Sequence, residues 1–153
     1  MFKNEEFIKL KQSIQVAKKE NLSSIDILYN KIHKSNKKQI CHCDIITHSA
    51  DPFRHQISPK NKIYSAKIKM YFSSNDCLKQ NLLNSEYLHK NIGIENASNY
   101  YFHKSIEQLN EKEKITLLVM FENPALYNPE RRAEKVREKV DEYQKILNNQ
   151  NGR

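Results

Sequence analysis

The chain has 153 residues, which suits one domain with a modest core rather than two independent ones. Lysine and arginine outnumber aspartate and glutamate by 26 to 18, and the resulting charge of +8 is compatible with nucleic acid, an anionic membrane surface or a phosphorylated ligand. Two glycines and four prolines argue against Gly-rich phosphate-binding loops and long flexible linkers, and they favour a mostly helical protein.

Two helices are predicted near the N-terminus. Polar residues 21–24 separate them, and Ser23 followed by Asp26 is typical of the start of the second helix. A lysine-rich stretch, residues 34–39, predicts a loop after it. Apolar residues step by three and four along both segments: Phe7, Leu10, Ile14 and Ala17 in the first, and Ile25, Leu28 and Ile32 in the second.

The middle of the chain has the least regular pattern. Residues 41–62 contain Pro52 and Pro59 and a turn-like composition, so they predict irregular structure. Residues 63–72 alternate between apolar and polar side chains as a strand would, but several of the apolar ones also fall on one helical face. Local periodicity therefore leaves both strand and helix open for this segment.

The last third of the chain predicts helices more clearly. Leucine spacing indicates a short helix over residues 78–83, and another is expected over residues 94–102. Asn110 followed by Glu113 is a capping arrangement, because the asparagine side chain accepts a hydrogen bond from an early backbone N–H. The helix that follows is expected to end at Pro124, which cannot continue it.

A final helix is predicted to start after Asn128. This residue is expected at the N-cap and Pro129 at the first helical position, where a missing N–H costs nothing. The apolar residues of the helix follow a 3-4-3-4 spacing that places them on one face: Ala133, Val136, Val140, Tyr143 and Leu147.

Cysteine usage and the lack of apolar runs indicate where the protein resides. Cys41, Cys43 and Cys77 form an odd set with an i, i+2 pair, which is not typical of a secreted disulfide framework. The first 18 residues contain no apolar run with a cleavage site, and nowhere are there about 18 consecutive apolar residues. As written, the chain is expected to be soluble and cytoplasmic.

One stretch of about forty residues resembles a known family without any gap. Residues 93–105 read GIENASNYYFHKS, and they resemble the G-[IV]-E-x-A-[AS]-x-x-Y-F-x-K-[SP] motif of family 51 peptidoglycan glycosyltransferases, the transglycosylase domains of penicillin-binding proteins. Leu109 and Glu113 follow at the family's L-x-x-x-E spacing. Pro124 and residues 127–129 then match its P-x-x-Y-N-P motif.

Three further motifs of the family are matched in part. Arg137 and Val140 fall on the second arginine and the valine of R-R-x-x-V-L. Leu83 and Asn84 match the end of K-x-x-I-L-x-x-Y-L-N. Residues 46–47 match the central Ile-Thr of G-G-S-T-I-T-Q-Q, with different residues at its glycine, serine and glutamine positions.

The resemblance implies a fold for the whole chain. It implies a mainly α, lysozyme-like helical domain of reduced size, spanning residues 1–153 as a single domain, with the closer match over residues 93–140 and the less close match over residues 10–92. It also implies a helix over residues 63–72, against the local strand pattern. Side chains in the matched region have expected structural roles: Tyr100, Tyr101 and Phe102 in the core, Glu95 on the surface, Glu113 as a cap and Lys104 in solvent.

The family's reaction requires a carboxylate that this chain lacks at the expected place. Family members join lipid-linked disaccharides (lipid II) into glycan strands of the bacterial cell wall at the outer face of the cytoplasmic membrane. A glutamate takes the proton of the acceptor hydroxyl, while basic groups and often a metal ion stabilise the departing pyrophosphate. The position of that glutamate falls on Gln15, whose amide cannot accept the proton, and Glu20 is the alternative nearby.

The family's second glutamate, in an R-K-x-x-E motif, is missing as well. No glutamate occurs between Glu20 and Glu86, and the only acids between the Ile-Thr and Leu-Asn matches are Asp51 and Asp76. Neither follows an Arg-Lys pair. The sequence therefore predicts a catalytically inactive relative, a pseudoenzyme.

Three retained motif positions are the predicted substrate-binding residues: Thr47, Asn84 and Arg137. The resemblance implies a lipid-linked peptidoglycan precursor or a cell-wall protein as the partner. No cofactor and no metal are expected.

Two other classes of function were weighed. Residues 41–43 read Cys-His-Cys and have His48 and His55 nearby, but a C-x-C pair lacks the usual zinc-ligand spacing and no second cysteine pair exists. Alternatively, the chain is a basic helical module that binds nucleic acid or protein, although no recognition motif is evident. The residues that would meet phosphates are Lys31, Lys34, Lys37 and Lys38, interleaved with Tyr29.

Overall fold

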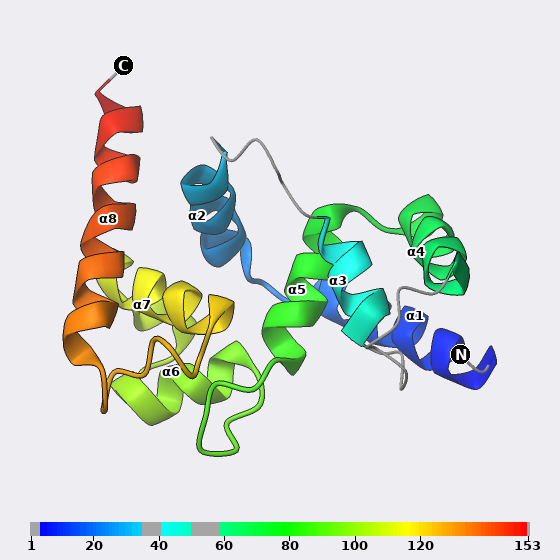
Figure 1. Cartoon of the computed structure of the whole chain (residues 1–153), viewed down its shortest axis with the longest axis horizontal. Helices are drawn as coiled ribbons and strands as arrows, with labels where there is room; N and C mark the ends of the chain where they lie inside the picture. The colour runs from blue at the N-terminus through cyan, green and yellow to red at the C-terminus, as the bar shows by residue number, and fades with distance from the viewer. Residues whose placement is uncertain (1–3, 35–40, 50–58, 153) are drawn as a thin grey trace. The chain divides into compact units, whose positions relative to one another are not determined.

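The structure, a computed structural model, describes residues 4–34, 41–49 and 59–152 (Figure 1). These residues form eight α-helices and one short 3-10 helix, and they contain no strand. The mainly α fold expected from the sequence is confirmed. Most of the expected loop over residues 34–39 lies outside the described residues. None of the described helices combines the length and the apolar run that crossing a bilayer requires.

The chain divides into two compact units. Unit 1 comprises Met1–Leu22 and Lys37–Asn81, and unit 2 comprises Ser23–Asn36 and Leu82–Arg153. Each unit is described by itself below. The extent of a single domain over residues 1–153 stays a prediction.

Unit 1 contains α1 (Asn4–Lys19), α3 (His42–Ser49), α4 (Pro59–Tyr71) and most of α5 (Ser74–Asn84). The first helix is confirmed, because Leu10, Ile14 and Ala17 are buried along one face of α1. The same core takes one or two residues from each of the other helices, and it consists of Leu10, Ile14, Cys43, Ile46, Ile68, Phe72 and Cys77. Apolar burial of this kind is the main force that holds short helices together.

The irregular structure predicted for residues 41–62 is wrong at both ends of that range. Residues 42–49 form α3, and Pro59 begins α4 at a first helical position, where proline is tolerated. The helical pattern of α3 is short, because its core positions, Cys43 and Ile46, are only three residues apart. A pattern of barely two turns does not stand out by periodicity.

The helix implied for residues 63–72 is confirmed by α4. Ser65, Ile68 and Phe72 are buried at helical spacing. Ala66 and Met70, which contributed to the strand-like alternation, are both exposed, Met70 by 79%. The alternation was therefore produced by apolar residues on the surface.

A disulfide joins Cys43 on α3 to Cys77 on α5, while Cys41 is free. Both bonded residues are fully buried in the core of unit 1. This pair was not predicted from the sequence. Sequence spacing could not reveal it, because 34 residues separate the two and only the packing of α3 and α5 brings their Cα atoms to 5.1 Å.

Unit 2 is built around α7 (Glu111–Glu122), which contacts α2 (Ser23–His33), α6 (Ile94–Phe102) and α8 (Ala133–Asn151) (Figure 1). The 3-10 helix Ile106–Gln108 lies between α6 and α7 in the chain. The second half of α7 is apolar nearly all round, with Ile115, Leu117, Leu118, Val119 and Met120 each fully buried. A helix of that composition has to be enclosed by neighbours.

The capping box predicted for α7 is confirmed. The Asn110 Oδ1 accepts from the Glu113 N–H, and the Glu113 Oε2 accepts from the Asn110 N–H, both at 2.9 Å. The Lys104 Nζ lies 2.6 Å from the Glu113 Oε1, so Lys104 is ion-paired and only partly in solvent. Hydrogen bonds from Lys104 and from the Asn110 backbone lower the pKa of Glu113 below its usual value.

The start predicted for the last helix is wrong. The Asn128 Oδ1 accepts from the backbone N–H groups of Glu130 and Arg131, which closes a turn, and α8 begins only at Ala133. Arg132, with φ −137° and ψ 45°, interrupts the helical backbone between turn and helix. The apolar face of α8 is buried as predicted apart from Ala133, which is exposed.

The three aromatics at the end of α6 do not all belong to the core. Tyr100 is 43% exposed, and Tyr101 and Phe102 are half-buried. Instead, Ile94, Ala97 and Ser98 fill the buried face of α6. Glu95 is exposed as expected.

Candidate functional site

The two sequence-predicted positions of unit 1 have opposite environments. Gln15, at the family's glutamate position, is exposed on α1. Thr47 is 1% exposed on α3, and its Oγ1 donates a 2.6 Å hydrogen bond to the backbone oxygen of Cys43 one turn earlier. The structure therefore does not bring the two side chains to a common surface.

The two predicted positions of unit 2 are both on its surface. Asn84 is exposed at the end of α5, and Arg137 is exposed on α8. Arg137 lines a hollow together with Lys112 and Thr116, whose apolar wall includes Val136 and Val140. Asn84 is not among the residues that line it. Two cationic side chains at one hollow suit an anionic ligand group such as a phosphate.

Asp44 of unit 1 lies close to a cation. The Lys69 Nζ is 2.7 Å from its Oδ1 and 2.8 Å from its Oδ2, and the Ser65 hydroxyl donates to Oδ1. Burial alone would raise the pKa of Asp44, but the hydrogen bonds from Lys69 and Ser65 and the charge of Lys69 outweigh it and lower the pKa. Asp44 is therefore a weaker base than a free aspartate.

Of the other candidate acids of unit 1, one caps a helix, one is exposed, and one lies outside the described residues. The Asp76 Oδ2 accepts from the Ser73 N–H at 2.9 Å, and the Ser73 hydroxyl accepts from the Asp76 N–H, which caps α5. Lys18 lies 3.8 Å from the same carboxylate. Glu20 is exposed just after α1, and Asp51 lies outside the described residues.

A third carboxylate, Glu122, forms a cluster in unit 2 that sequence reasoning missed. The Tyr143 hydroxyl is 2.7 Å from both of its oxygens, and the His33 Nε2 is 2.9 Å from Oε1. Burial and the hydrogen bond to Glu122 raise the pKa of Tyr143 well above its usual value. The three residues come from α7, α8 and α2, and their separation along the chain left no spacing signal.

The residues suggested for a zinc site and for nucleic-acid binding are either engaged elsewhere in the fold or lie outside the described residues. Cys43 is in the disulfide and so cannot serve as a thiolate ligand, and His55 lies outside the described residues. The Tyr29 ring packs 4.4 Å from that of His33 and 6.3 Å from that of Phe121, so it is not free to stack on a base. Burial and the charge of Glu122 raise its pKa to about 12. Lys37 and Lys38 lie outside the described residues.

Comparison with known families decides the relationship. Residues 51–149, well over half of the chain, match the transglycosylase family. The chain belongs to this family. The resemblance drawn from the motifs is thereby confirmed, and it supports a peptidoglycan glycosyltransferase-like function with a peptidoglycan precursor as the substrate class. A comparison with curated proteins found no match.

The matched residues of this transglycosylase-family chain include two of the four predicted site positions. Asn84 and Arg137 lie within residues 51–149, whereas Gln15 and Thr47 precede them. The match takes in α4 to α7 and nearly all of α8. The binding role of these positions stays a prediction.

Proposed function

We propose that this chain is a transglycosylase-family protein that does not polymerise glycan and that retains binding of a lipid-linked peptidoglycan precursor. The proposal that the chain does not polymerise glycan rests on the lowered pKa and the close contacts of the Asp44 carboxylate. A general base for sugar hydroxyls needs a carboxyl whose pKa is tuned upward and which is within reach of the acceptor. Asp44 has its pKa lowered instead and is engaged by Lys69 and Ser65.

Three further described carboxylates support the same proposal. Asp76 and Glu113 each accept a backbone N–H at the start of a helix, and moving either one would uncap that helix. Glu122 accepts from Tyr143 with both of its oxygens. Loss of one general acid or base typically lowers a rate about 10²- to 10⁴-fold, so loss of both family glutamates leaves little activity.

The purified chain is expected to form no glycan polymer from lipid II. The measurement is a gel or chromatographic assay of labelled lipid II, with a boiled sample as the blank and an active transglycosylase as the positive control. Absence of product is the expected result, because both family glutamates are missing and the Asp44 carboxylate is held by Lys69 and Ser65 with its pKa lowered. Polymer above the boiled blank would show that the proposal of inactivity is wrong.

Precursor binding is proposed to use Arg137 and Lys112. A diphosphate group placed in their hollow would receive charge-assisted hydrogen bonds, and the wall of Val136 and Val140 offers apolar surface beside it. The Lys112 Nζ is 3.8 Å from the Asp141 Oδ1, and its side chain is 57% exposed, so it is loosely paired and able to turn toward a ligand.

Arg137→Ala is expected to weaken binding of lipid II in detergent micelles about tenfold, the loss expected for one charge-assisted hydrogen bond to a phosphate. The measurement is a titration followed by calorimetry or by displacement of a labelled precursor. Lys145→Ala is the matched control, because it removes one exposed positive charge from the same helix away from this hollow. An equal loss of lipid II affinity in both variants would mean that Arg137 contributes only its positive charge, and it would contradict a specific site.

A further inference from the structure

The two units of the chain carry very different charges. Unit 1 contains 13 lysine and arginine residues against 6 aspartate and glutamate residues, whereas unit 2 contains 13 against 12. With histidine neutral, the net charges are therefore +7 for unit 1 and +1 for unit 2. A charge concentrated in this way attracts an anionic partner and steers its approach. A partner of that kind is expected to meet unit 1.

The helix α4 of unit 1 presents an exposed apolar strip. Ile63 and Met70 are seven residues apart, so they lie in one line along the helix, and Ala66 falls between them. Met70 and Ile63 are 79% and 56% exposed, and Ala66 is exposed as well. The opposite side of α4 supplies Ile68 and Phe72 to the core. The strip is therefore left over after the core of unit 1 has formed, and contiguous exposed apolar residues mark interaction sites.

Lysines border the strip on both sides. Lys62 and Lys69 lie on one side of it and Lys67 on the other, because one turn of the helix takes 3.6 residues. The helix contains no aspartate or glutamate. Lys69 is paired with Asp44, but Lys62 and Lys67 are exposed and have no carboxylate partner among the described residues. The charges of Lys62 and Lys67 are therefore available to a partner.

An aromatic residue of α4 and a lysine of α1 extend the surface. The Lys11 Nζ lies 3.8 Å from the centre of the Tyr71 ring, and Tyr71 is 59% exposed. The ammonium group and the ring attract each other by a cation–π interaction, which limits the freedom of both side chains. Little side-chain entropy is lost when a partner covers a tyrosine that is already held. We call the following residues the α4 face: Lys11, Lys62, Ile63, Lys67, Met70 and Tyr71.

The composition of the α4 face decides the class of partner. Binding to a phosphate backbone uses lysines but gives no role to the exposed Ile63 and Met70, which disfavours nucleic acid. A helix that lies in a membrane surface typically exposes Trp, Phe or Leu, and none of the large exposed apolar residues in the described part of unit 1 is one of these. A second copy of the chain would bring like charges together. An apolar centre that includes methionine and tyrosine, with a charged rim, is typical of a protein–protein interface.

We propose that the α4 face docks an acidic amphipathic helix of a partner protein. Such a helix, laid along α4, places its apolar residues against Ile63 and Met70 and its glutamates or aspartates opposite the lysines on each side. The 13 residues of α4 span about 20 Å, which matches three to four turns of the partner. Docking on unit 1 does not depend on the precursor binding proposed beside Arg137 of unit 2.

The test is a titration of the full chain with a fluorescent helical peptide, crosslinked between side chains, that carries leucine at i, i+4 and i+7 and glutamate on both sides. Anisotropy is expected to show saturable binding with a dissociation constant of about 10–100 µM at low salt, and added salt should weaken it. The same peptide with lysine in place of glutamate should bind at least about tenfold more weakly. Met70→Glu should weaken the acidic peptide about tenfold, because it places a negative charge in the apolar centre.

Reversal of one charge separates a defined contact from general attraction. Lys67→Glu is expected to weaken the acidic peptide about tenfold and to strengthen the lysine peptide by a similar factor. Lys145→Glu is the matched control, because it makes the same change at an exposed residue of α8 in unit 2 and should leave both affinities nearly unchanged. If the two reversals have equal effects, the α4 face is not the docking site. Arg137→Ala should keep full affinity for the acidic peptide, so failure of this proposal and of precursor binding can be told apart.

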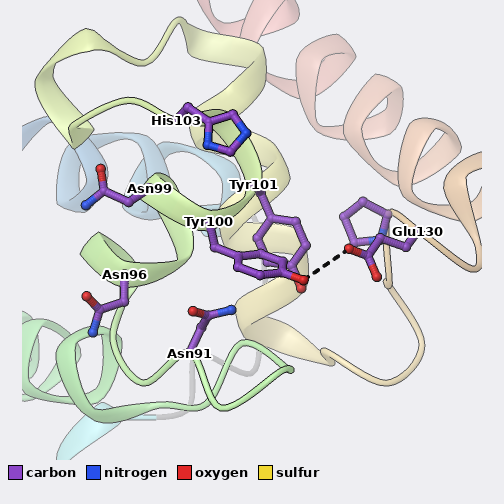
Figure 2. Close-up of a pocket in the computed structure, with 8 residues that line it drawn as sticks. Asn91, Asn96, Asn99, Tyr100, Tyr101, His103 and Glu130 are labelled. Carbon is purple, nitrogen blue, oxygen red and sulfur yellow. Dashed lines mark hydrogen bonds between the residues drawn. The ribbon is translucent and has the colours of Figure 1, made fainter.

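Tyr100→Ala is the matched control for Tyr71→Ala. Tyr100 is an exposed tyrosine of unit 2, but its hydroxyl points toward the Glu130 carboxylate, 3.5 Å from Oε1 (Figure 2). A left-handed turn at residues 88–90 places the His89 ring 5.5 Å from the Tyr100 ring, with the His89 Nε2 2.9 Å from the Glu130 Oε2. An acidic helix gains nothing beside Glu130, so only Tyr71→Ala should lose affinity, about threefold to tenfold. Circular dichroism checks that every variant is folded.

Other occupants of the α4 face give different results. Phosphatidylglycerol vesicles that bind the chain more tightly than the acidic peptide does, and lose it in Met70→Glu, would identify a membrane surface instead. Duplex DNA whose binding is lost in Lys67→Glu but kept in Met70→Glu would identify a nucleic acid. A dimer in sedimentation that Met70→Glu dissociates would identify a second copy. Each of these results, or equal affinity for the acidic and lysine peptides, would overturn the proposal.

Discussion

Gly93→Ala is expected to lower the free energy of unfolding of unit 2 by about 2–5 kcal/mol. Gly93 has φ +87° and ψ 147°, a backbone conformation that residues with a Cβ rarely adopt. A Cβ built there would lie 2.6 Å from the backbone oxygen of Leu83. That atom belongs to the last turn of α5 and cannot rotate away as a side chain could. Chemical denaturation of wild type and variant measures the difference.

Gly152→Ala is the matched control for this substitution. A Cβ at Gly152 would lie 3.7 Å from the Asn148 oxygen, an ordinary contact, and its φ of −92° suits any residue. Its effect is expected to stay within about 0.5 kcal/mol, as for most surface changes. If the two variants unfold at the same denaturant concentration, the explanation offered for Gly93 is wrong.

The second large effect is expected on breaking the bond between Cys43 and Cys77. The crosslink spans 34 residues, and the chain-entropy relation for a loop of that length gives about 3–4 kcal/mol of stabilisation. Replacing both cysteines with alanine should lower the stability of unit 1 by about this amount. Denaturant titrations with and without reductant measure it. The wild type should lose stability on reduction, and the double variant should not respond.

Cys41→Ser serves as the control, because Cys41 is free and only half-buried. This variant should keep the response to reductant, since it retains the crosslink. Thiol counting on the native protein provides an independent check, with one reactive group expected from the three cysteines. Three free thiols in protein purified without reductant would contradict the crosslink itself.

The elements that the sequence predicted well are those in which several local signals agree. The bounds of α6 coincide with the predicted 94–102, and the box between Asn110 and Glu113 forms as the spacing required. In α4, by contrast, the local pattern favoured a strand as much as a helix. Only the resemblance to the family predicted α4 correctly, because exposed apolar residues such as Met70 obscured the helical face.

The features that the sequence did not reveal depend on backbone geometry or on contacts between distant segments. Pro129 and Asn128 fit a helix start in isolation, yet the turn that they form ends before α8 begins. The left-handed turn at residues 88–90 contains no glycine, which is the usual sign of such backbone. Without that turn, nothing in the sequence places His89 beside Tyr100 and Glu130.

The candidate site could be predicted only in part, because it also depends on contacts between segments that are distant in the sequence. Arg137 was selected by its motif position, and the structure places it on an exposed hollow. Its neighbour Lys112 lies on another helix and carried no signal in the sequence. The missing glutamates predicted the lack of a suitable base, but the engagement of Asp44 by Lys69 could not be predicted because it depends on the packing of α3 against α4.

The path of the chain through its two units limits how the protein can be dissected. Because α2 precedes residues 37–81 in sequence but packs with α7 and α8, the two units are interleaved along the polypeptide. No single cut separates them. A fragment restricted to the family-matched residues 51–149 would lack Ile25, Leu28 and Ile32 and would expose the apolar surface that they cover, so binding experiments need the whole polypeptide.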